Sequence, residues 1–167
     1  MFRLNGRDVV AHGDETIIQA AQRHGVAIPH LCYKDGLRPD GNCRACVVEI
    51  KGERVLAPSC CRKPAAGMEV SSDSARAVAA QKMVLELLLS DMPAERHTRE
   101  SELDHWAQKL AVGKPRFGAR AQPAGDASHH AISVNLDACI QCTRCLRACR
   151  EEQVNDVIGY AFRGQHA

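Results

Sequence analysis

The sequence has no long hydrophobic run, few aromatic residues and almost no excess charge. Its longest apolar runs, such as Leu87 to Leu89, fall far short of the roughly 20 residues that span a bilayer, so we expect no membrane association. Aromatic residues make up only 4% of the chain, which suits a small β-rich unit and helices that pack through aliphatic side chains. The 22 Lys and Arg residues nearly balance the 20 Asp and Glu residues, so the composition gives no reason to expect a nucleic-acid partner.

Signals for export and for substrate chemistry are also absent from the sequence. The opening segment, MFRLNGRDVV, contains no apolar h-region and has the pattern of a strand. No G-x-G-x-x-G or other Gly-rich phosphate loop occurs, so the chain itself is not expected to bind NAD, and no nucleophile–base pair indicates a catalytic site. We therefore expect a cytoplasmic chain without catalytic residues of its own.

What the sequence has in abundance is cysteine, at nine positions. Disulfides are disfavoured in a reducing cytoplasm, so cysteines at this density are better explained as metal ligands. Eight of the nine fall into two groups, one near each end of the chain.

The first group comprises Cys32, Cys43, Cys46 and Cys60, with the spacing C-x10-C-x2-C-x13-C. A loop with one Cys-x2-Cys pair and two outlying cysteines can surround a [2Fe–2S] cluster with four thiolates. The first gap is longer than that of the plant-type motif, which indicates a different ferredoxin lineage. Gly41 lies where the backbone must pass close to the cluster, and amide hydrogens directed at the sulfurs would stabilise the anionic cluster.

Two further points concern this first group. Cys61 is predicted to be a spare thiol, because adjacent cysteines cannot easily both face one metal site. A structural zinc site is the alternative, but its ligands usually come as two Cys-x2-Cys knuckles and this stretch has only one.

The second group comprises Cys139, Cys142, Cys145 and Cys149. C-x2-C-x2-C-x3-C is the bacterial ferredoxin pattern for [4Fe–4S] binding. We expect the first three cysteines to hold one [4Fe–4S] cluster and Cys149 to point toward a second one, completed by ligands outside this chain. The alternative is that Cys149 is the fourth ligand of the first cluster.

Three arginines flank the same cluster site, at positions 144, 147 and 150. They either offset the negative charge of the cluster or meet an acidic partner, or else they form the solvated face of a short helix over 145–154. The sequence leaves both interpretations open.

The predicted fold class is α+β, with four stretches in order along the chain. These are a β-grasp [2Fe–2S] ferredoxin-like domain at 1–71, a helical connector at 72–112, a linker at 113–130, and the first half of a bacterial-type [4Fe–4S] ferredoxin domain at 131–167.

Turn residues, caps and hydrophobic periodicity predict the elements within these stretches. In chain order they are a hairpin at 2–10 turned by Asn5-Gly6, a helix at 15–24 capped by Asp14, a cysteine-bearing loop at 29–46, strands at 47–50, 54–56 and 68–70, a helix from Asp73 to Ser90, a helix at 99–112 with Leu103, Trp106, Ala107 and Leu110 on one stripe, and a short strand at 132–136.

Two segments resemble a known family. IPHLCYKDGLRPDGNCRACVVEIKGERVLAPSC is similar to the [2Fe–2S] domain of the large iron–sulfur subunit of respiratory complex I and its soluble relatives. NLDACIQCTRCLRACREEQVNDVIGYAFRG resembles, more narrowly, the N-terminal part of the α subunit of NAD-dependent molybdenum or tungsten formate dehydrogenases. The resemblance implies an electron-transfer component that relays electrons between a molybdopterin-containing catalytic subunit or domain and a flavin/NAD-binding iron–sulfur subunit. None of the catalytic domain is present, so this chain alone is not expected to oxidise formate.

The chain departs from these relatives in one place. Many of them carry a His-plus-three-Cys [4Fe–4S] site in the segment that matches 91–112, where this sequence has His97 and His105 but no cysteine. We therefore predict no metal there.

Other functions remain as alternatives at this point. The chain is either an electron-transfer subunit of another complex I-like diaphorase or hydrogenase, a free ferredoxin-like carrier, or a zinc-stabilised interaction module. The unfinished second cysteine motif favours stable docking in a complex over free shuttling.

Overall fold

The computed structural model describes residues 1–93, 100–119, 121 and 124–162. Its first element is a hairpin of β1 (Phe2–Leu4) and β2 (Arg7–Val9), paired in the register Phe2↔Val9. Asn5 and Gly6 turn the hairpin with φ angles of 50° and 77°. Positive φ at both positions is what a two-residue turn of this kind requires, so the predicted Asn-Gly turn is confirmed.

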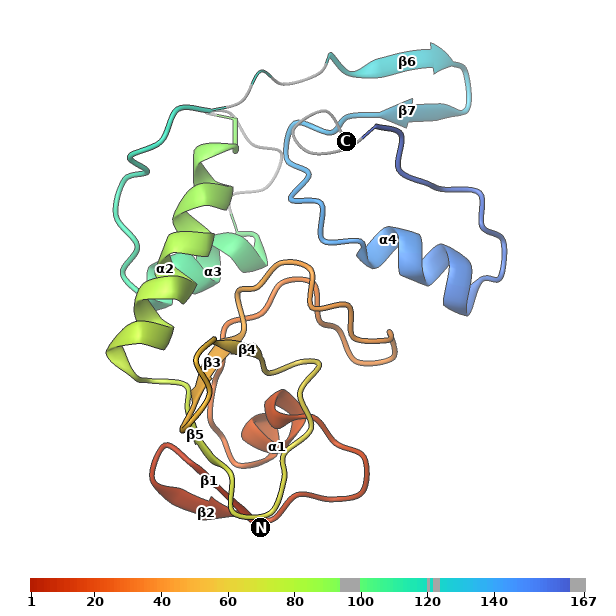
Figure 1. Ribbon diagram of the computed structural model, residues 1–167. Coiled ribbons are helices and arrows are strands. Elements are labelled where there is room, and N and C mark those ends of the chain that lie inside the picture. Colours follow the sequence, from red (N-terminus) through yellow and green to blue (C-terminus); the bar gives the residue numbers. More distant parts are fainter. Residues whose placement is uncertain (94–99, 120, 122–123, 163–167) are drawn as a thin grey trace.

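Five short strands form one mixed sheet in the order β2-β1-β5-β3-β4. The remaining strands are β3 (Val47–Ile50), β4 (Ala57–Pro58) and β5 (Glu69–Ser71). β5 runs parallel to β1 and antiparallel to β3. This strand order, with one helix between the two hairpins in sequence, is the arrangement expected of a β-grasp domain (Figure 1).

The predicted strand at 54–56 is wrong, because the strand that pairs with β3 begins at Ala57. Val55 is 59% exposed, and the carbonyl of Arg54 accepts a hydrogen bond from Arg76 of the following helix at 2.5 Å. β4 lies at the sheet edge, where Pro58 is tolerated because the missing N–H would face away from the ladder.

Helix α1 (Ile17–Arg23) is capped by Thr16 and not by Asp14 as predicted. The backbone N–H of Thr16 donates to the side chain of Gln19 at 2.8 Å, which forms a capping box. The Asp14 carboxylate instead accepts a hydrogen bond from Lys63 at 2.8 Å. Gly25 follows the helix with φ +70°, as expected of its terminator.

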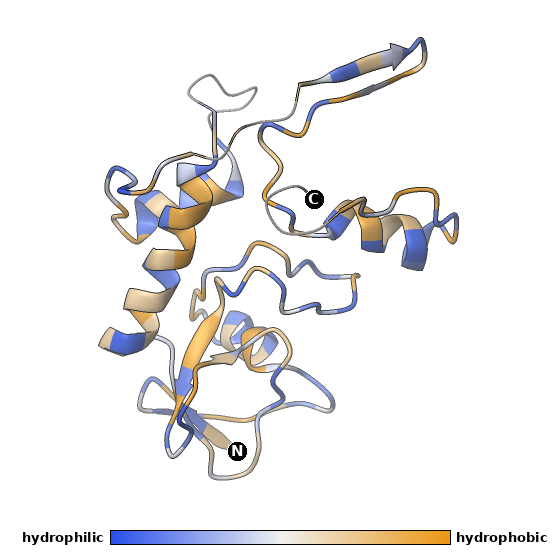
Figure 2. Cartoon of the chain, turned by 45° about the horizontal axis from the view of Figure 1, so that its top comes forward, coloured by the Kyte–Doolittle hydropathy of each residue, from blue (hydrophilic) through white to orange (hydrophobic). Residues whose placement is uncertain are grey.

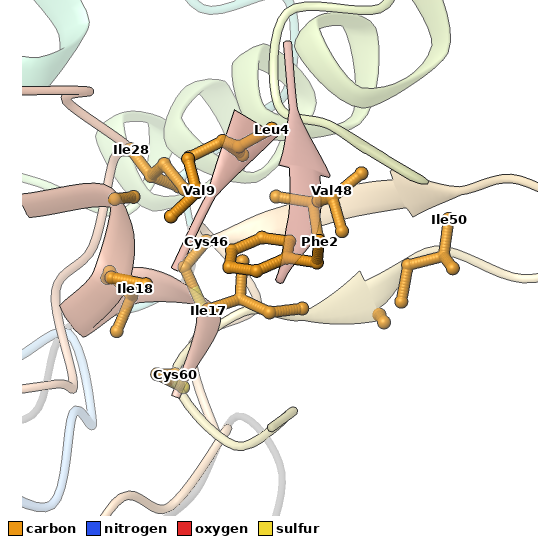
Figure 3. Packing of buried hydrophobic residues seen from close by; sticks show 14 of the residues in the cluster. Phe2, Leu4, Val9, Ile17, Ile18, Ile28, Cys46, Val48, Ile50 and Cys60 are labelled. Carbon is orange, nitrogen blue, oxygen red and sulfur yellow. The ribbon is translucent and has the colours of Figure 1, made fainter. Parts of the chain in front are cut away.

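The main core lies between the sheet and α1 (Figure 3). Figure 3 shows Cys46 among its apolar side chains, next to Phe2 and Ile17. A fully buried aliphatic or aromatic side chain contributes roughly 1.5–3 kcal/mol, so this core fixes the backbone around two of the cysteines. Its buried members are Phe2, Leu4, Val9, Ile17, Ile18, Ala20, Ala21, Ile28, Tyr33, Cys46, Val48, Ile50, Ala57, Cys60 and Val70.

A second core joins two helices to the cysteine-bearing loop. Helix α2 (Ala75–Ser90) is capped by Ser74, one residue after the predicted start, and α3 (Glu102–Lys109) is capped by Ser101. Three residues of the predicted stripe, Leu103, Trp106 and Ala107, are buried on α3. The fourth, Leu110, caps the helix and is partly buried against the same core. The buried members of this core are Leu31, Ala45, Leu85, Leu103 and Trp106, and Cys43 and Ile140 pack against them.

The C-terminal region begins with a hairpin, β6 (Asp126–His129) and β7 (Ile132–Val134). Residues 126–129 were predicted to be linker, and their pairing with β7 corrects that prediction. Every residue of both strands is exposed, and Figures 1 and 2 show the hairpin standing away from the rest of the chain. None of the helices within the described residues has the length and apolarity needed to cross a bilayer.

Helix α4 (Arg144–Arg147) continues into a π-helical turn, η1 (Ala148–Glu152). The predicted helix at 145–154 therefore exists, although it starts one residue earlier and ends two residues earlier. Figure 1 shows α4 alongside the cysteine-bearing loop that follows α1. The two cysteine groups are thus placed next to each other by the fold.

Candidate metal centres

The cysteines of the first group come from three places in the N-terminal domain. Cys32 and Cys43 lie on the loop between α1 and β3, Cys46 immediately precedes β3, and Cys60 follows β4. Cys32, Cys46 and Cys60 are at most 1% exposed, and Cys43 is half-buried. The structure therefore brings all four predicted ligands to one partly sheltered site.

Their sulfur atoms form a connected set. The side chain of Cys32 interacts with those of Cys43 and Cys60, and the side chain of Cys46 interacts with that of Cys60. Backbone amides add to this set, since the N–H of Cys32 donates to the Sγ of Cys43 at 3.3 Å. The amides of Asn42 and Cys43 donate to the sulfur of Cys32. The expected amide hydrogens directed at the sulfurs are thus present.

The same contacts decide where negative charge is stabilised. Hydrogen bonds from Cys43 and then Cys60 lower the pKa of Cys32, and the hydrogen bond from Cys60 lowers the pKa of Cys46 to about 7. Hydrogen bonding to Cys32 raises the pKa of Cys43, and hydrogen bonding to Cys32 and Cys46 raises the pKa of Cys60. The donor set already favours thiolates at two positions, and thiolates are the form that binds metals.

The donor chemistry of this site fits a [2Fe–2S] cluster. Four cysteines with no carboxylate or imidazole among them make an all-sulfur set. Within the described residues, no three His, Cys, Asp or Glu side chains converge on one point as a site for a single ion.

Ser59 is a polar residue of this site that the sequence analysis missed. It is fully buried, and its hydroxyl donates to the carbonyl of Cys46 at 2.7 Å. The same side chain also hydrogen-bonds the Cys46 sulfur and helps to lower its pKa. Its position directly before Cys60 was the available signal, since a small hydroxyl residue beside a ligand can reach the neighbouring sulfur.

Cys61 differs from its neighbour in exposure. It is exposed, whereas Cys60 is fully buried, and their sulfurs are 3.6 Å apart. Gly41, with φ +63°, passes close to it, since a Cβ built on Gly41 would lie 2.9 Å from the Cys61 sulfur. The backbone at Gly41 thus passes close to Cys61 and Pro58, and its approach to the cluster stays a prediction.

The second cysteine group lies on an irregular segment that leads into α4. Gln141 and Thr143, on either side of Cys142, have positive φ angles of 54° and 63°. The N–H of Gln141 donates to the Sγ of Cys139 at 3.4 Å. Left-handed residues on either side of a cysteine curl the backbone, which lets successive sulfurs face inward.

The four cysteines of this group differ in their surroundings. Cys139 and Cys142 are half-buried, Cys145 is exposed, and Cys149 is buried in η1. Burial raises the pKa of Tyr160, and the negative charges of Cys139, Cys142 and Cys145 raise it further. The Tyr160 hydroxyl donates to the carbonyl of Gln141, which lies between Cys139 and Cys142 in sequence, at 3.1 Å.

The three arginines of this segment, which the sequence did not separate, have different roles. Arg147 is only 5% exposed, Arg144 has a side chain that is 22% exposed, and Arg150 is exposed and paired with Asp156. The Nε of Arg144 is buried and has no hydrogen-bond partner in the described part of the chain. A buried N–H group next to a cysteine run can donate a hydrogen bond to the sulfurs of a cluster.

The segment at 91–112 contains two histidines, and the structure describes one of them, His105. The His105 ring packs against Trp106 with ring centroids 5.6 Å apart, and Trp106 belongs to the second core. His97 lies outside the described residues. The absence of metal from this segment remains a prediction.

Comparison with known proteins bears on the N-terminal site first. Residues 1–75 match the sequence profile of the family described as "2Fe-2S iron-sulfur cluster binding domain". The N-terminal part of the chain is thus similar to 2Fe-2S cluster-binding domains. The matched residues contain all four cysteines of the first group, together with Gly41, Ser59 and Cys61.

The whole chain is similar to part of several larger redox proteins. It is 35% identical to the NADP-reducing hydrogenase subunit HndD of Solidesulfovibrio fructosivorans, over 96% of this chain and 29% of that protein. It is also 35% identical to the mitochondrial NADH-ubiquinone oxidoreductase 78 kDa subunit of Candida albicans, over 93% of this chain and 22% of that protein. The chain therefore spans less than a third of the length of these curated relatives.

A solved structure shares the fold of nearly the whole chain, including the part that follows residue 75. A crystal structure of NAD+-reducing [NiFe]-hydrogenase in the H2-reduced state superposes with a TM-score of 0.87 at 26% identity. The match covers 99% of this chain and 71% of that one. The helices, the exposed hairpin and the second cysteine segment thus belong to an arrangement that recurs in another redox protein.

Proposed function

We propose that this chain is the iron–sulfur electron-transfer part of an NAD(P)-linked oxidoreductase complex. In this proposal Cys32, Cys43, Cys46 and Cys60 hold a [2Fe–2S] cluster, which accepts and releases one electron at a time when bound. The single observation that carries the proposal is that contacts between their side chains link these four cysteines, within residues that match the 2Fe-2S cluster-binding family.

The residues around the site have two tasks in this proposal. The amides of Cys32, Asn42 and Cys43 donate to sulfur, which favours the reduced and more negative state of the site. The two cores on either side keep water away from Cys32, Cys46 and Cys60.

For the second group we propose that Cys139, Cys142 and Cys145 hold a [4Fe–4S] cluster. The left-handed backbone at Gln141 and Thr143, on either side of Cys142, supports grouping them. Cys149, buried in the π-helical turn, would then serve a second [4Fe–4S] cluster completed by ligands outside the described residues, or else complete the first one.

The complex to which the chain belongs is a finer proposal. The second cysteine segment resembles that of NAD-dependent formate dehydrogenases, which predicts a molybdopterin-containing partner and a flavin/NAD-binding partner. The names of the relatives favour a second candidate, a hydrogenase or a complex I-like NADH dehydrogenase. A zinc-stabilised interaction module is the alternative of another class.

Spectroscopy on the anaerobically purified chain tests the proposal against the zinc alternative. We expect brown protein with iron and acid-labile sulfide, and a [2Fe–2S] electron paramagnetic resonance (EPR) signal after reduction. Colourless protein that contains zinc but no iron would contradict the proposal.

Metal analysis of the native complex separates the two candidate complexes. An affinity tag on this chain, expressed in its own host, should bring down a flavin-containing partner. Molybdenum or tungsten in the purified complex supports the formate dehydrogenase proposal, whereas nickel without either metal supports a [NiFe]-hydrogenase.

A further inference from the structure

Arg147 is a buried cation without a carboxylate partner. It lies at the end of α4 with 5% of its surface exposed, and no ion pair within the described residues includes it. The other arginines near it each have an acidic partner, Arg144 with Glu102 and Arg150 with Asp156. Burying a charge away from water is unfavourable unless negative potential compensates it, so a buried guanidinium in this position points to a negative partner beyond its oxygen acceptors.

The hydrogen bonds of Arg147 connect the two cysteine groups. Its Nη2 donates to the carbonyl of Cys32, from the first group, and to that of Cys142 at 3.4 Å, from the second. Its Nη1 donates to the carbonyl of Arg38 at 2.6 Å, and its Nε to the Thr143 hydroxyl at 3.1 Å. One rigid, planar guanidinium thus bridges the backbone of a cysteine from each group.

The surrounding contacts keep the same two segments together. Thr143 donates to Asp40 at 2.8 Å, and Asn42 donates to the carbonyl of Gln141 at 2.6 Å. Ile140 and Cys43 pack against the same core. Within this set, Arg147 is the residue of the second segment that reaches the backbone of a cysteine in the first group.

We propose that Arg147 is a positioning residue that fixes the two cysteine groups relative to each other and supplies the counter-charge for the [2Fe–2S] site. The inference rests on the proposed function. An iron–sulfur cluster with four thiolate ligands is anionic, so it provides the negative potential that the buried guanidinium lacks among the protein side chains. The same positive charge favours reduction, because reduction adds negative charge to the site. Arg147 therefore both holds the electron-transfer geometry and raises the potential of the [2Fe–2S] site.

The test uses Arg147→Gln, Arg147→Lys and the control Arg150→Gln in the full chain. Arg150 lies on the same helical segment and the control removes the same charge, but its side chain is exposed and does not bridge the cysteine groups. Two quantities are measured, the midpoint potential of the [2Fe–2S] EPR signal and hydrogen exchange of the backbone at 139–149.

We expect Arg147→Gln to shift the reduction equilibrium about tenfold toward the oxidised state, about 59 mV for a one-electron couple. Exchange at 139–149 should rise in the same variant. Arg147→Lys should keep most of the potential, because it keeps the charge, yet raise the exchange, because a single ammonium cannot reproduce the fork. Arg150→Gln should change neither quantity by a comparable amount.

Two results would overturn the inference. If Arg147→Gln matches Arg150→Gln in both quantities, Arg147 has neither role. If exchange rises but the potential is unchanged, Arg147 is not the counter-charge. Failure of the proposed function would look different, since the unaltered chain would then show no [2Fe–2S] signal at all.

Discussion

The backbone N–H of Cys32 donates a hydrogen bond to the Sγ of Cys43, 3.3 Å away. This contact closes the long first gap of the cysteine motif into a ring, so that both ends of the loop meet at one site. Leu31, before the first of these cysteines, is buried in the second core, and Cys43 packs against that core. The loop is therefore fixed at its two ends by sulfur contacts and by burial together.

Replacing Cys60 and Cys61 one at a time by serine tests which of the two is a ligand of the [2Fe–2S] cluster. Cys61→Ser should leave the [2Fe–2S] signal intact because the Cys61 thiol is exposed, whereas Cys60→Ser should abolish or strongly reduce it because that thiol is buried among the others. Visible absorption and EPR of both purified variants give the answer. The reverse pattern would show that Cys61 is the ligand.

Gly41→Ala should destabilise the cysteine-bearing loop for two reasons. A left-handed φ costs a residue with a Cβ about 1–2 kcal/mol, and the new Cβ would lie 2.9 Å from the Cys61 sulfur. Gly36 is the matched control, since its φ of +87° carries the first cost but nothing lies within 4 Å of its Cβ position.

Urea titration followed by the visible absorption of the cluster measures both variants. Gly41→Ala should lose its cluster at lower urea than Gly36→Ala, and adding Cys61→Ala should recover part of the difference. Equal midpoints for the two glycine variants would mean that the contact with Cys61 has no energetic consequence.

Glu86→Gln should reduce stability at neutral pH by weakening the contact between α2 and Arg116. The Glu86 carboxylate accepts bonds from the Nε of Arg116 at 2.7 Å and from its Nη2 at 2.8 Å, which lowers the pKa of Glu86 to about 2. A lowered pKa contributes stability that is fully present above the ordinary value of 4.5 and is lost as the pH falls toward about 2.

The difference between the unaltered chain and Glu86→Gln should thus be constant near neutral pH and shrink below about pH 4.5. Urea unfolding followed by the fluorescence of Trp106, the single tryptophan, measures it. Glu69→Gln, in an exposed ion pair with Lys51, is the control and should have little effect at any pH. A penalty that grows on acidification would contradict this account.

Cys149→Ser tests how the second cysteine group is divided. If Cys139, Cys142 and Cys145 hold one cluster while Cys149 serves another, the isolated chain should show a weak [4Fe–4S] signal that Cys149→Ser does not abolish. A full-occupancy, air-stable [4Fe–4S] signal that disappears in this variant would mean that all four cysteines close a single site.

Local chemistry explains which parts of the fold were predictable. The Asn5-Gly6 turn follows from a short-range rule, and the structure has it. The helix cap was assigned to Asp14 because an acidic residue before an apolar run is a good cap, but Lys63, distant in sequence, takes that carboxylate. The strand that pairs with β3 was expected at 54–56. The local sequence does not show that Arg76 hydrogen-bonds the backbone at Arg54.

The candidate site divides in the same way. Cysteine spacing is a local property of the chain, so the sequence alone was enough to select the four cysteines of the first group as candidate ligands. It did not identify which of three arginines on one short helix is buried. Burial of Arg147 depends on the carbonyls of Cys32 and Arg38, more than a hundred residues earlier, and no local pattern records such a contact.

The most direct test of the central claim is EPR of the reduced full chain, with iron and sulfide counted on the same sample and Cys46→Ser as its control. The account predicts a [2Fe–2S] signal in the unaltered chain, and its loss or severe weakening in Cys46→Ser. An equally strong signal in Cys46→Ser, or an unaltered chain that binds no iron, would contradict it.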